Sequence, residues 1–241
     1  GAAGALGGDA VAKSAPNALM FFFAASPTMT ITPHVIKSMP FDPLKDVVPI
    51  APILSYANVL VVNNDQPFKT VPELVAYAKA NPGKVTSGHG GVGSTPHLQC
   101  LLLSSLTGMK FALVPYRGSA PAMNDLVSGQ IDSMCDLAPT VVPQEQAGTI
   151  RSLLVSMPER LSVTPNVPTS KEAGLPDYQF AGWNAIFAPK GTPKDVVDKL
   201  SGALLAALAD AGVKKRIEET GAVPSTAAEA TPDALRKLLP V

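Results

Sequence analysis

The sequence predicts an α/β protein in which strands and helices alternate along most of its 241 residues. Short apolar runs rich in Val, Leu and Phe, typical of buried strands, alternate with stretches that open on helix-start signals such as Ser or Thr followed by Pro. Such alternation indicates a largely parallel sheet with helices on its faces. The 24 prolines lie singly at segment edges, where stiff turns are expected.

The first half of the chain is expected to open with a Gly-rich loop over residues 1–8. Thr70 and Glu73 form a potential capping box for a helix that stops at Asn81-Pro82-Gly83. A glycine loop at 88–93 leads to a second helix that begins near Ser94. Strands are expected at 19–23, 47–54, 58–62 and 84–87.

The second half continues the alternation, and Asp136 lies at the end of one of its strands. Thr192 is expected to cap a helix that runs to Leu208. The remaining expected strands are 111–114, 131–135 and 151–156, with an extended segment at 178–188. The remaining expected helices are 118–129, one from 138, 214–219 and 232–239.

Two soft boundaries, near residues 63–67 and 188–191, bracket a central block. We therefore expect one lobe from residues 64–185, inserted between the two parts of another lobe at 1–63 and 186–241. A bracket of this kind is typical of an inserted domain joined by two crossovers.

Composition excludes several classes of function. Lys and Arg total 19 and Asp and Glu total 19, so there is no net charge to favour nucleic acid or an anionic membrane as the main partner. The longest apolar run, residues 18–25, is too short to span a bilayer, and no signal peptide is recognised. Cys100 and Cys135 could form one bridge in an exported protein, but two buried thiols are the simpler interpretation.

Small hydroxyl residues follow several expected strands, at the carboxyl ends where open α/β sheets bind ligands. Helix starts at these places present free N–H groups that can hold a carboxylate or a phosphate. The alternative is that these residues are ordinary caps and turns, which would explain any single one of them. The positions concerned are Ser26 to Thr28, 87–95, 117–119 and Asp136.

Specific catalytic signatures are missing, since the glycine loop lacks a P-loop ending and there is no Gly-x-Ser-x-Gly elbow. A metal site could use His89, His97 and Cys100, although no second pair with zinc-type spacing supports it. Asp136 and Glu145 could act as acid and base, but no spacing supports pairing them. Trp183 could be a core residue or close a pocket wall, and His34 is expected on the surface or in packing.

Several segments, in order, resemble an extracytoplasmic solute receptor of the tripartite tricarboxylate transporter family, of the Bug type. The clearest is Val-Pro-Tyr-Arg-Gly-Ser-Ala-Pro-Ala at 114–122. The others are Met-Pro-Phe-Asp-Pro-x-Lys-Asp at 39–46, and the segments 58–63, 80–84, 94–98, 166–176 and 188–193.

This resemblance implies a periplasmic protein of two α/β lobes, type II-like, that captures a small organic anion in an interlobe cleft. It would deliver that ligand to a membrane permease, with no cofactor, no metal and no catalysis, most simply as a monomer. Di- and tricarboxylates, acidic amino acids and aromatic carboxylates are the candidate ligands. Family members have a first strand, a ligand-binding loop and a helix before the segment that resembles residues 1–8, and we expect this chain to lack them.

The resemblance also suggests the ligand contacts, in which backbone amides and hydroxyl groups grip the carboxylate. Arg117 follows the family's basic position, with a side chain that could point outwards. The alternatives are a hydrolase or lyase on a similar two-lobed fold, and a receptor that presents its ligand to a signalling partner. The expected ligand-binding residues are Ser26, Thr28, Gly93, Ser94, Thr95, His97, Gly118, Ser119, Ala120 and Asp136.

Overall fold

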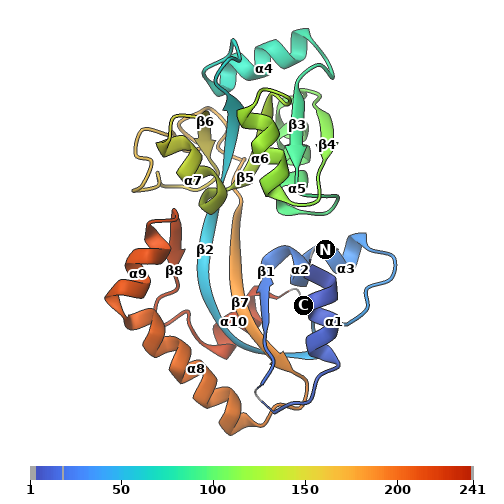
Figure 1. The fold of residues 1–241 in the computed structure, drawn as a ribbon, viewed down its shortest axis with the longest axis vertical. Helices are drawn as coiled ribbons and strands as arrows, with labels where there is room; N and C mark the ends of the chain where they lie inside the picture. Colours follow the sequence, from blue (N-terminus) through green and yellow to red (C-terminus); the bar gives the residue numbers. More distant parts are fainter. Residues whose placement is uncertain (1–3, 18, 240–241) are drawn as a thin grey trace. The chain divides into compact units, whose positions relative to one another are not determined.

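The computed structural model describes residues 4–17 and 19–239 (Figure 1). By their contacts the residues form two compact units. Unit 1 is Gly1–Ser55, Gly182–Glu218 and Val223–Val241, and unit 2 is Tyr56–Ala181 with Glu219–Ala222. The domain boundaries expected near residues 64 and 185 stay a prediction. Among the described residues, no helix combines the length and the apolar character needed to cross a membrane.

Unit 2 is built on a mixed sheet. The second half of β2 (Val47–Asn63) pairs antiparallel with β5 (Ser133–Leu137) and with β6 (Ile150–Val155). β3 (Thr86–His89) pairs parallel with β5 and with β4 (Ala112–Pro115). The expectation of a largely parallel sheet is therefore right for the pairs of β3 with β4 and β5. It is wrong for the pairs of β2 with β5 and β6, which are antiparallel, because the sequence does not show which strands are neighbours.

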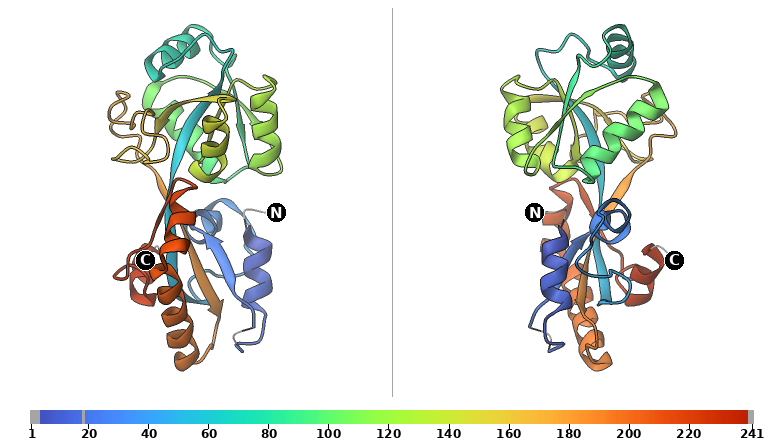
Figure 2. Two further views of the ribbon diagram at one scale, coloured as in Figure 1. Left: turned by 60° about the vertical axis from the view of Figure 1, so that its left-hand side comes forward. Right: turned by 90° about the vertical axis from the view of Figure 1, so that its right-hand side faces the viewer.

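Helices cover both faces of this sheet, as Figure 2 shows. On one face, α6 (Ser119–Val127) and α7 (Ala138–Gln146) pack over Val59, Val61 and Met134. On the other, α4 (Val71–Ala80) and α5 (Thr95–Thr107) pack over Leu60, Val62 and Cys135. Successive residues of β2 and β5 thus alternate between two apolar cores, as the strand period of two requires.

Unit 1 has a smaller, antiparallel sheet. β1 (Phe22–Ala25) pairs with β7 (Ala181–Pro189), which lies beside β2, and β8 (Ala222–Pro224) also pairs with β2. Phe22, Phe41 and Phe187 lie in the main core. Its helices are α1 (Ala5–Ala12), α2 (Ser26–Thr30), α3 (Thr32–Val35), α8 (Lys194–Ala209), α9 (Ala211–Glu218) and α10 (Pro232–Leu238).

Three expectations about unit 1 are wrong. The Gly-rich opening is helical from Ala5, since α1 uses its glycines for close packing, with Gly8 against Phe41. The strand expected at 19–23 begins only at Phe22, because the apolar run before it is exposed, with Leu19 at 84%. Thr192 does not cap α8; its Oγ1 donates to the Pro189 carbonyl at 2.7 Å and Pro193 occupies the N-cap.

A fourth expectation fails where the chain passes between the units. The strands expected at 47–54 and 58–62 form one continuous 17-residue strand, β2. The expected gap between the two strands, at residues 55–57, is itself extended. Tyr56 and Ala57 are also buried, although they interrupt the aliphatic run. The Thr70 cap of α4 is confirmed, with Oγ1 accepting from Glu73 N at 3.4 Å, and Glu73 accepts from Lys69 N rather than from the cap.

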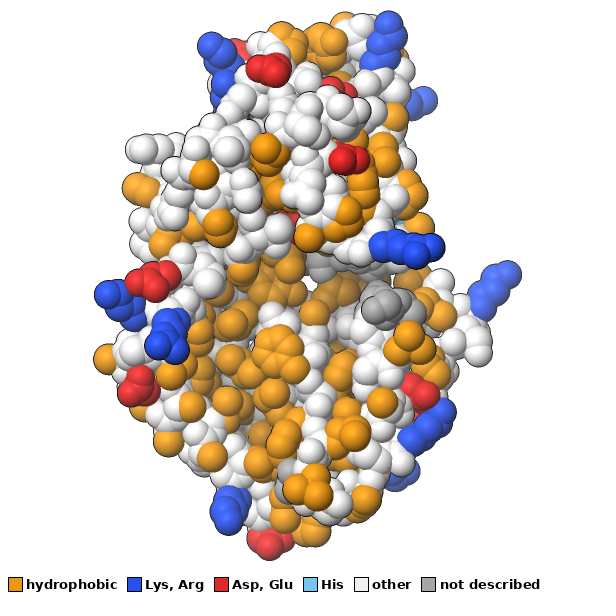
Figure 3. All heavy atoms as spheres, viewed as in Figure 1, with side chains coloured by type: hydrophobic (Ala, Val, Ile, Leu, Met, Phe, Trp, Pro, Cys, Tyr) orange, Lys and Arg blue, Asp and Glu red, His pale blue; other side chains and the backbone are white. Residues whose placement is uncertain are grey.

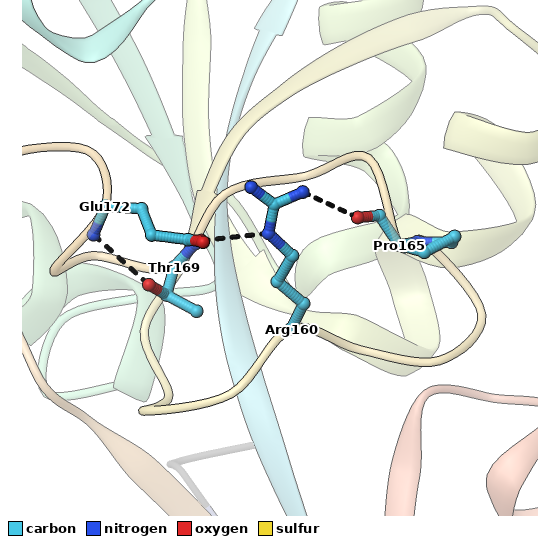
Figure 4. Close-up of polar contacts among 4 residues, drawn as sticks. All are labelled: Arg160, Pro165, Thr169 and Glu172. Atoms are coloured by element: carbon cyan, nitrogen blue, oxygen red, sulfur yellow. Dashed lines mark hydrogen bonds and ion pairs between the residues drawn. The ribbon is translucent and has the colours of Figure 1, made fainter.

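The segment at 166–176 has a structural use in unit 2. It belongs to the long connection between β6 and β7, which Figure 4 shows in close-up. The Glu172 carboxylate accepts from Arg160 Nε at 2.9 Å and from Thr169 N at 2.8 Å, and Arg160 Nη1 donates to the Pro165 carbonyl at 2.8 Å. The Arg160 guanidinium, followed by the Thr169 N–H, lowers the pKa of Glu172 to about 2. These bonds order the connection.

Candidate functional site

The carboxyl ends of three parallel strands meet at one edge of unit 2. β4, β3 and β5 are neighbours in that order, and each runs directly into a helix start, at α6, α5 and α7 respectively. We call residues 89–97, 116–120 and 136–138 at these junctions the three-loop edge. Because parallel strands point the same way, the sheet brings together helix N-termini that are far apart in sequence.

The first junction is an ordered loop that ends in a capped helix. Ser94 is the N-cap of α5: its Oγ accepts from His97 N at 3.4 Å and donates to the Gly91 carbonyl at 2.7 Å. Gly93 N donates to His97 Nδ1 at 3.3 Å, and the His89 and His97 rings lie 4.5 Å apart. Burial lowers the pKa of both imidazoles, and for His89 the nearby His97 adds to that effect. Both rings are therefore neutral near pH 7.

The second junction touches the first. A Cβ added at Gly90 would lie 3.4–3.5 Å from backbone atoms of Gly118 and Ser119, an ordinary van der Waals distance, so the two loops lie side by side. Gly118 has φ 111°, a conformation that favours glycine, and it is the N-cap of α6. No side chain caps α6, and Ala120 in its first turn is exposed. The first-turn N–H groups of this helix are thus open to an anion.

Asp136 ties the third junction to the second. Its Oδ1 accepts from Ser119 Oγ at 2.9 Å and from Leu137 N at 2.8 Å. The side chain is fully buried, and Oδ2 has no hydrogen-bond partner among the described residues. Burial raises the pKa of Asp136 to about 6, while the bonds from Leu137 and Ser119 oppose that rise. α7, which follows, also lacks a side-chain cap.

Eight of the ten expected ligand contacts therefore lie on the three-loop edge. The other two, Ser26 and Thr28, are buried residues of α2 in unit 1. Ser26 is the first helical residue rather than the cap, and its Oγ accepts from Trp183 N at 3.3 Å. Thr28 packs against Gly4, where a Cβ would come within 2.6 Å of its Oγ1.

The remaining sequence candidates have structural explanations. Arg117 is exposed, Trp183 packs on the main core of unit 1, and Glu145 accepts two bonds from Ser152 and not from Asp136. Within the described residues, no group of three His, Cys, Asp or Glu side chains could hold a metal ion. Cys100 lies in the core beside Ser87, away from solvent.

Sequence analysis missed two features of this region. Gly90 was not singled out, although it lies beside Gly118 and Ser119 of the second junction, and only its place in a glycine-rich stretch could have indicated this. Gln99 and Tyr178 were also missed. They form a buried polar pair, with the Tyr178 hydroxyl 3.4 Å from Gln99 Oε1. A single Tyr in an apolar stretch carries no sequence signal for such a contact.

The fold and the three-loop edge define a class: an α/β protein whose neighbouring parallel strands run into helix starts at one edge of the sheet. The family model for the tripartite tricarboxylate transporter family receptor matches residues 1–232. The chain belongs to this family. It is accordingly a solute-binding receptor rather than an enzyme, and the hydrolase or lyase alternative is not favoured.

Curated relatives agree with this assignment. A UPF0065 protein of Agrobacterium vitis, from the TAR-I ttuE-ttuC' intergenic region, is 36% identical over 98% of this chain and 68% of its own length. Protein BugT of Bordetella pertussis is 32% identical over 98% of this chain and 72% of its own length. The chain thus spans about two thirds of the length of such relatives.

Solved structures match almost the whole chain. An R. palustris protein with adipate has a TM-score of 0.93 and 31% identity, covering 98% of this chain and 78% of that one. The periplasmic binding protein BugD has a TM-score of 0.91 and 33% identity, covering 99% of this chain and 79% of that one. MatC from Rhodopseudomonas palustris, with bound malate, has a TM-score of 0.91 and 32% identity, covering 99% and 81%. The chain therefore has the fold of these binding proteins.

Proposed function

We propose that the three-loop edge of unit 2 binds a carboxylate group of a small organic anion. The observation that carries this proposal is the meeting of the uncapped start of α6 with the start of α5 and with Asp136. Free N–H groups and the positive ends of helix dipoles stabilise an anion there, and Thr95 supplies a hydroxyl group. Ser26 and Thr28 of unit 1 stay expected contacts on the family resemblance alone.

The class of ligand is a di- or tricarboxylate, an acidic amino acid or an aromatic carboxylate. Adipate and malate in two similar structures support the first of these. The contacts on the three-loop edge are neutral donors rather than a cation, since Arg117 is exposed and both imidazoles are uncharged. Recognition by neutral donors suits several carboxylates of similar size.

Asp136 would set selectivity within that class. A second negative charge beside a carboxylate is costly, so Asp136 would accept a hydrogen bond from a hydroxyl or amino group of the ligand through its unpartnered Oδ2. The alternative is that it only joins Ser119 to Leu137. The test compares malate with succinate, which lacks the hydroxyl group, on the wild type and on Asp136→Asn. Equal changes in the affinities for malate and succinate would contradict the selectivity role.

The receptor would act in the periplasm as a monomer, and deliver its ligand to the membrane permease subunits of a tripartite transporter. Family membership and the periplasmic relative support this location. Neither charge nor fold favours nucleic acid as a partner. Light scattering of the purified receptor tests the monomer, and uptake of labelled ligand in cells with and without the permease tests delivery.

A thermal-shift screen against small organic acids tests binding itself. A ligand at one hundred times its Kd stabilises the folded state by about 2.7 kcal/mol, which raises Tm by roughly 5–10 °C for a chain of this size. Adipate, malate, aspartate and benzoate represent the candidate classes. A flat response to all of them, with chemical turnover of any carboxylate ester, would instead favour the enzyme.

A further inference from the structure

Two cysteines meet in the core of unit 2 directly below the three-loop edge. Cys100 is on α5, five residues after Thr95, and Cys135 is on β5, one residue before Asp136. Both belong to the same core cluster and neither has any exposed surface. In the structure both are free thiols.

The side chains around the two thiols link the two elements that carry them. Ser87 Oγ lies 3.2 Å from Cys100 Sγ, and the Tyr178 hydroxyl lies 3.6 Å from Cys135 Sγ. The same hydroxyl is 3.4 Å from Oε1 of Gln99, the residue before Cys100. Tyr178 therefore joins α5 to β5 at the level of both sulfur atoms.

The thiols also interact directly. A hydrogen bond from the Cys135 thiol lowers the pKa of Cys100, while the same bond and complete burial raise the pKa of Cys135 well above its ordinary value. Buried thiols often serve only as small apolar side chains, and that remains the simplest account in a reducing compartment. In an oxidising compartment, two thiols in contact are instead placed to become a disulfide.

We propose that Cys100 and Cys135 form a disulfide when the receptor folds outside the cytoplasm, tying α5 to β5. The inference rests on the proposed periplasmic location. The bridge would hold Thr95 and His97, in the first turn of α5, at a fixed distance from Asp136. Two walls of the proposed carboxylate site would thus be joined covalently below the ligand.

The reaction is a dithiol–disulfide exchange with the disulfide of a thiol oxidoreductase. The Cys100 thiolate attacks that disulfide, forms a mixed disulfide and releases one oxidoreductase thiolate. Cys135 then loses its proton and attacks Cys100 Sγ, which forms the Cys100–Cys135 bond and releases the second oxidoreductase thiolate. The receptor loses two electrons and two protons, and the oxidoreductase disulfide is reduced to two thiols. Because both sulfurs are buried in the folded unit, the exchange takes place before the core closes.

Thiol counting on the exported receptor tests the proposal. The receptor, directed to the periplasm of a bacterial host, is unfolded in urea with iodoacetamide and no reductant, then weighed intact and mapped as peptides. We expect no alkylated cysteine, a mass about 2 Da below that of the reduced chain, and a linked peptide pair holding Cys100 and Cys135. Two alkylated cysteines would overturn the proposal. Prior reduction supplies the positive control, with both residues alkylated.

Stability supplies a second readout. The bridge closes a loop of about 36 residues, so a reductant should lower the wild-type Tm by about 10 °C. The double variant Cys100→Ala with Cys135→Ala should not respond to the reductant, and an equal drop in that variant would contradict the bridge. If the double variant does not fold, the oxidised and reduced forms of the wild type give the comparison alone.

Both readouts work without ligand, so the two proposals can fail separately. A bridged receptor that binds no carboxylate would overturn the proposed function and leave the disulfide. A receptor that binds carboxylate with two free thiols after export would overturn the disulfide alone.

Discussion

The two units contain similar amounts of helix and strand but differ in where their helices begin relative to the sheet. In unit 2, β4, β3 and β5 are parallel, and the helices that follow them all begin at one edge. In unit 1, β1 pairs antiparallel with β7, and only the five-residue helix α2 follows β1 directly. Parallel pairing, more than composition, decides where polar groups gather.

The units also differ in surface. Unit 1 exposes apolar residues before and within β1, where Phe22 and Ala24 face the core while Phe21 and Phe23 face outwards. On the face drawn in Figure 3, hydrophobic side chains gather over the strands of unit 1. The junctions of unit 2 instead present Ser, Thr, Gly and His. The comparison favours unit 2 as the place of the proposed carboxylate contacts, and four predictions can break or sharpen it.

The largest effect is expected at the start of α6. Ala120→Asp puts a carboxylate at an exposed first-turn position where the ligand carboxylate is proposed to lie. Two like charges side by side cost several kcal/mol, so we expect affinity to fall at least about a thousandfold while the folded state is little changed. Titration calorimetry measures the affinity.

The matched control is Ala234→Asp, which adds the same group to the first turn of α10 in unit 1. Its affinity should equal that of the wild type. A loss of binding in both variants, or in neither, would remove the distinction between the units.

Asp136→Asn should change how stability depends on pH. The folded-state pKa of Asp136, about 6, lies above its ordinary 3.8, so the folded protein binds more protons and loses stability as pH rises through this window. The Asn side chain has no such titration. Relative to the wild type, the variant should gain about 2–3 kcal/mol in the free energy of unfolding between about pH 4 and pH 8.

Urea unfolding at several pH values measures this gain. A curve for Asp136→Asn that runs parallel to that of the wild type would contradict the raised pKa of the buried carboxyl.

Glycine-to-alanine changes should lower the free energy of unfolding by different amounts in the two units. A Cβ at Gly8 would overlap the Phe41 ring in the main core of unit 1, so Gly8→Ala should lower the free energy of unfolding by about 1–3 kcal/mol. At Gly88 the obstacle is the terminal methyl group of Ile131, which can rotate away, so Gly88→Ala should cost less. Equal costs in chemical denaturation would contradict this ranking.

The smallest effect is expected in the connection drawn in Figure 4. Arg160→Met removes an exposed ion pair, so Tm at neutral pH should fall by no more than about 3 °C. Because Arg160 lowers the pKa of Glu172, that small contribution is present above about pH 4.5 and disappears as pH falls toward about 2. A difference between variant and wild type that is the same at pH 2 and pH 7 would assign the effect to packing.

Much of unit 2 could be predicted from sequence because its signals are local. Thr70 and Ser94 as helix caps, and the placement of Gly118 and Ser119 at a helix start, follow from residue preferences within one turn. The antiparallel pairing of β2 with β5 and β6 could not be predicted, because strand order depends on contacts between residues 71–96 positions apart.

The site could be predicted only in part for the same reason. Each junction shows its helix-start residues, but the bond from Ser119 to Asp136 and the contact of Gly90 with Gly118 arise only when β3, β4 and β5 lie side by side. In unit 1, the run Leu19 to Phe23 looked like a buried strand because apolar content does not reveal which residues end up exposed.

The most direct test of the central claim is amide chemical-shift mapping of the receptor titrated with malate and with adipate. If the three-loop edge of unit 2 takes the carboxylate, the amide signals of Thr95, Ser119 and Ala120 should shift with the ligand, and those of the α10 first turn, including Ala234, should not. Saturable shifts confined to other residues, with these three amides unmoved, would contradict the account.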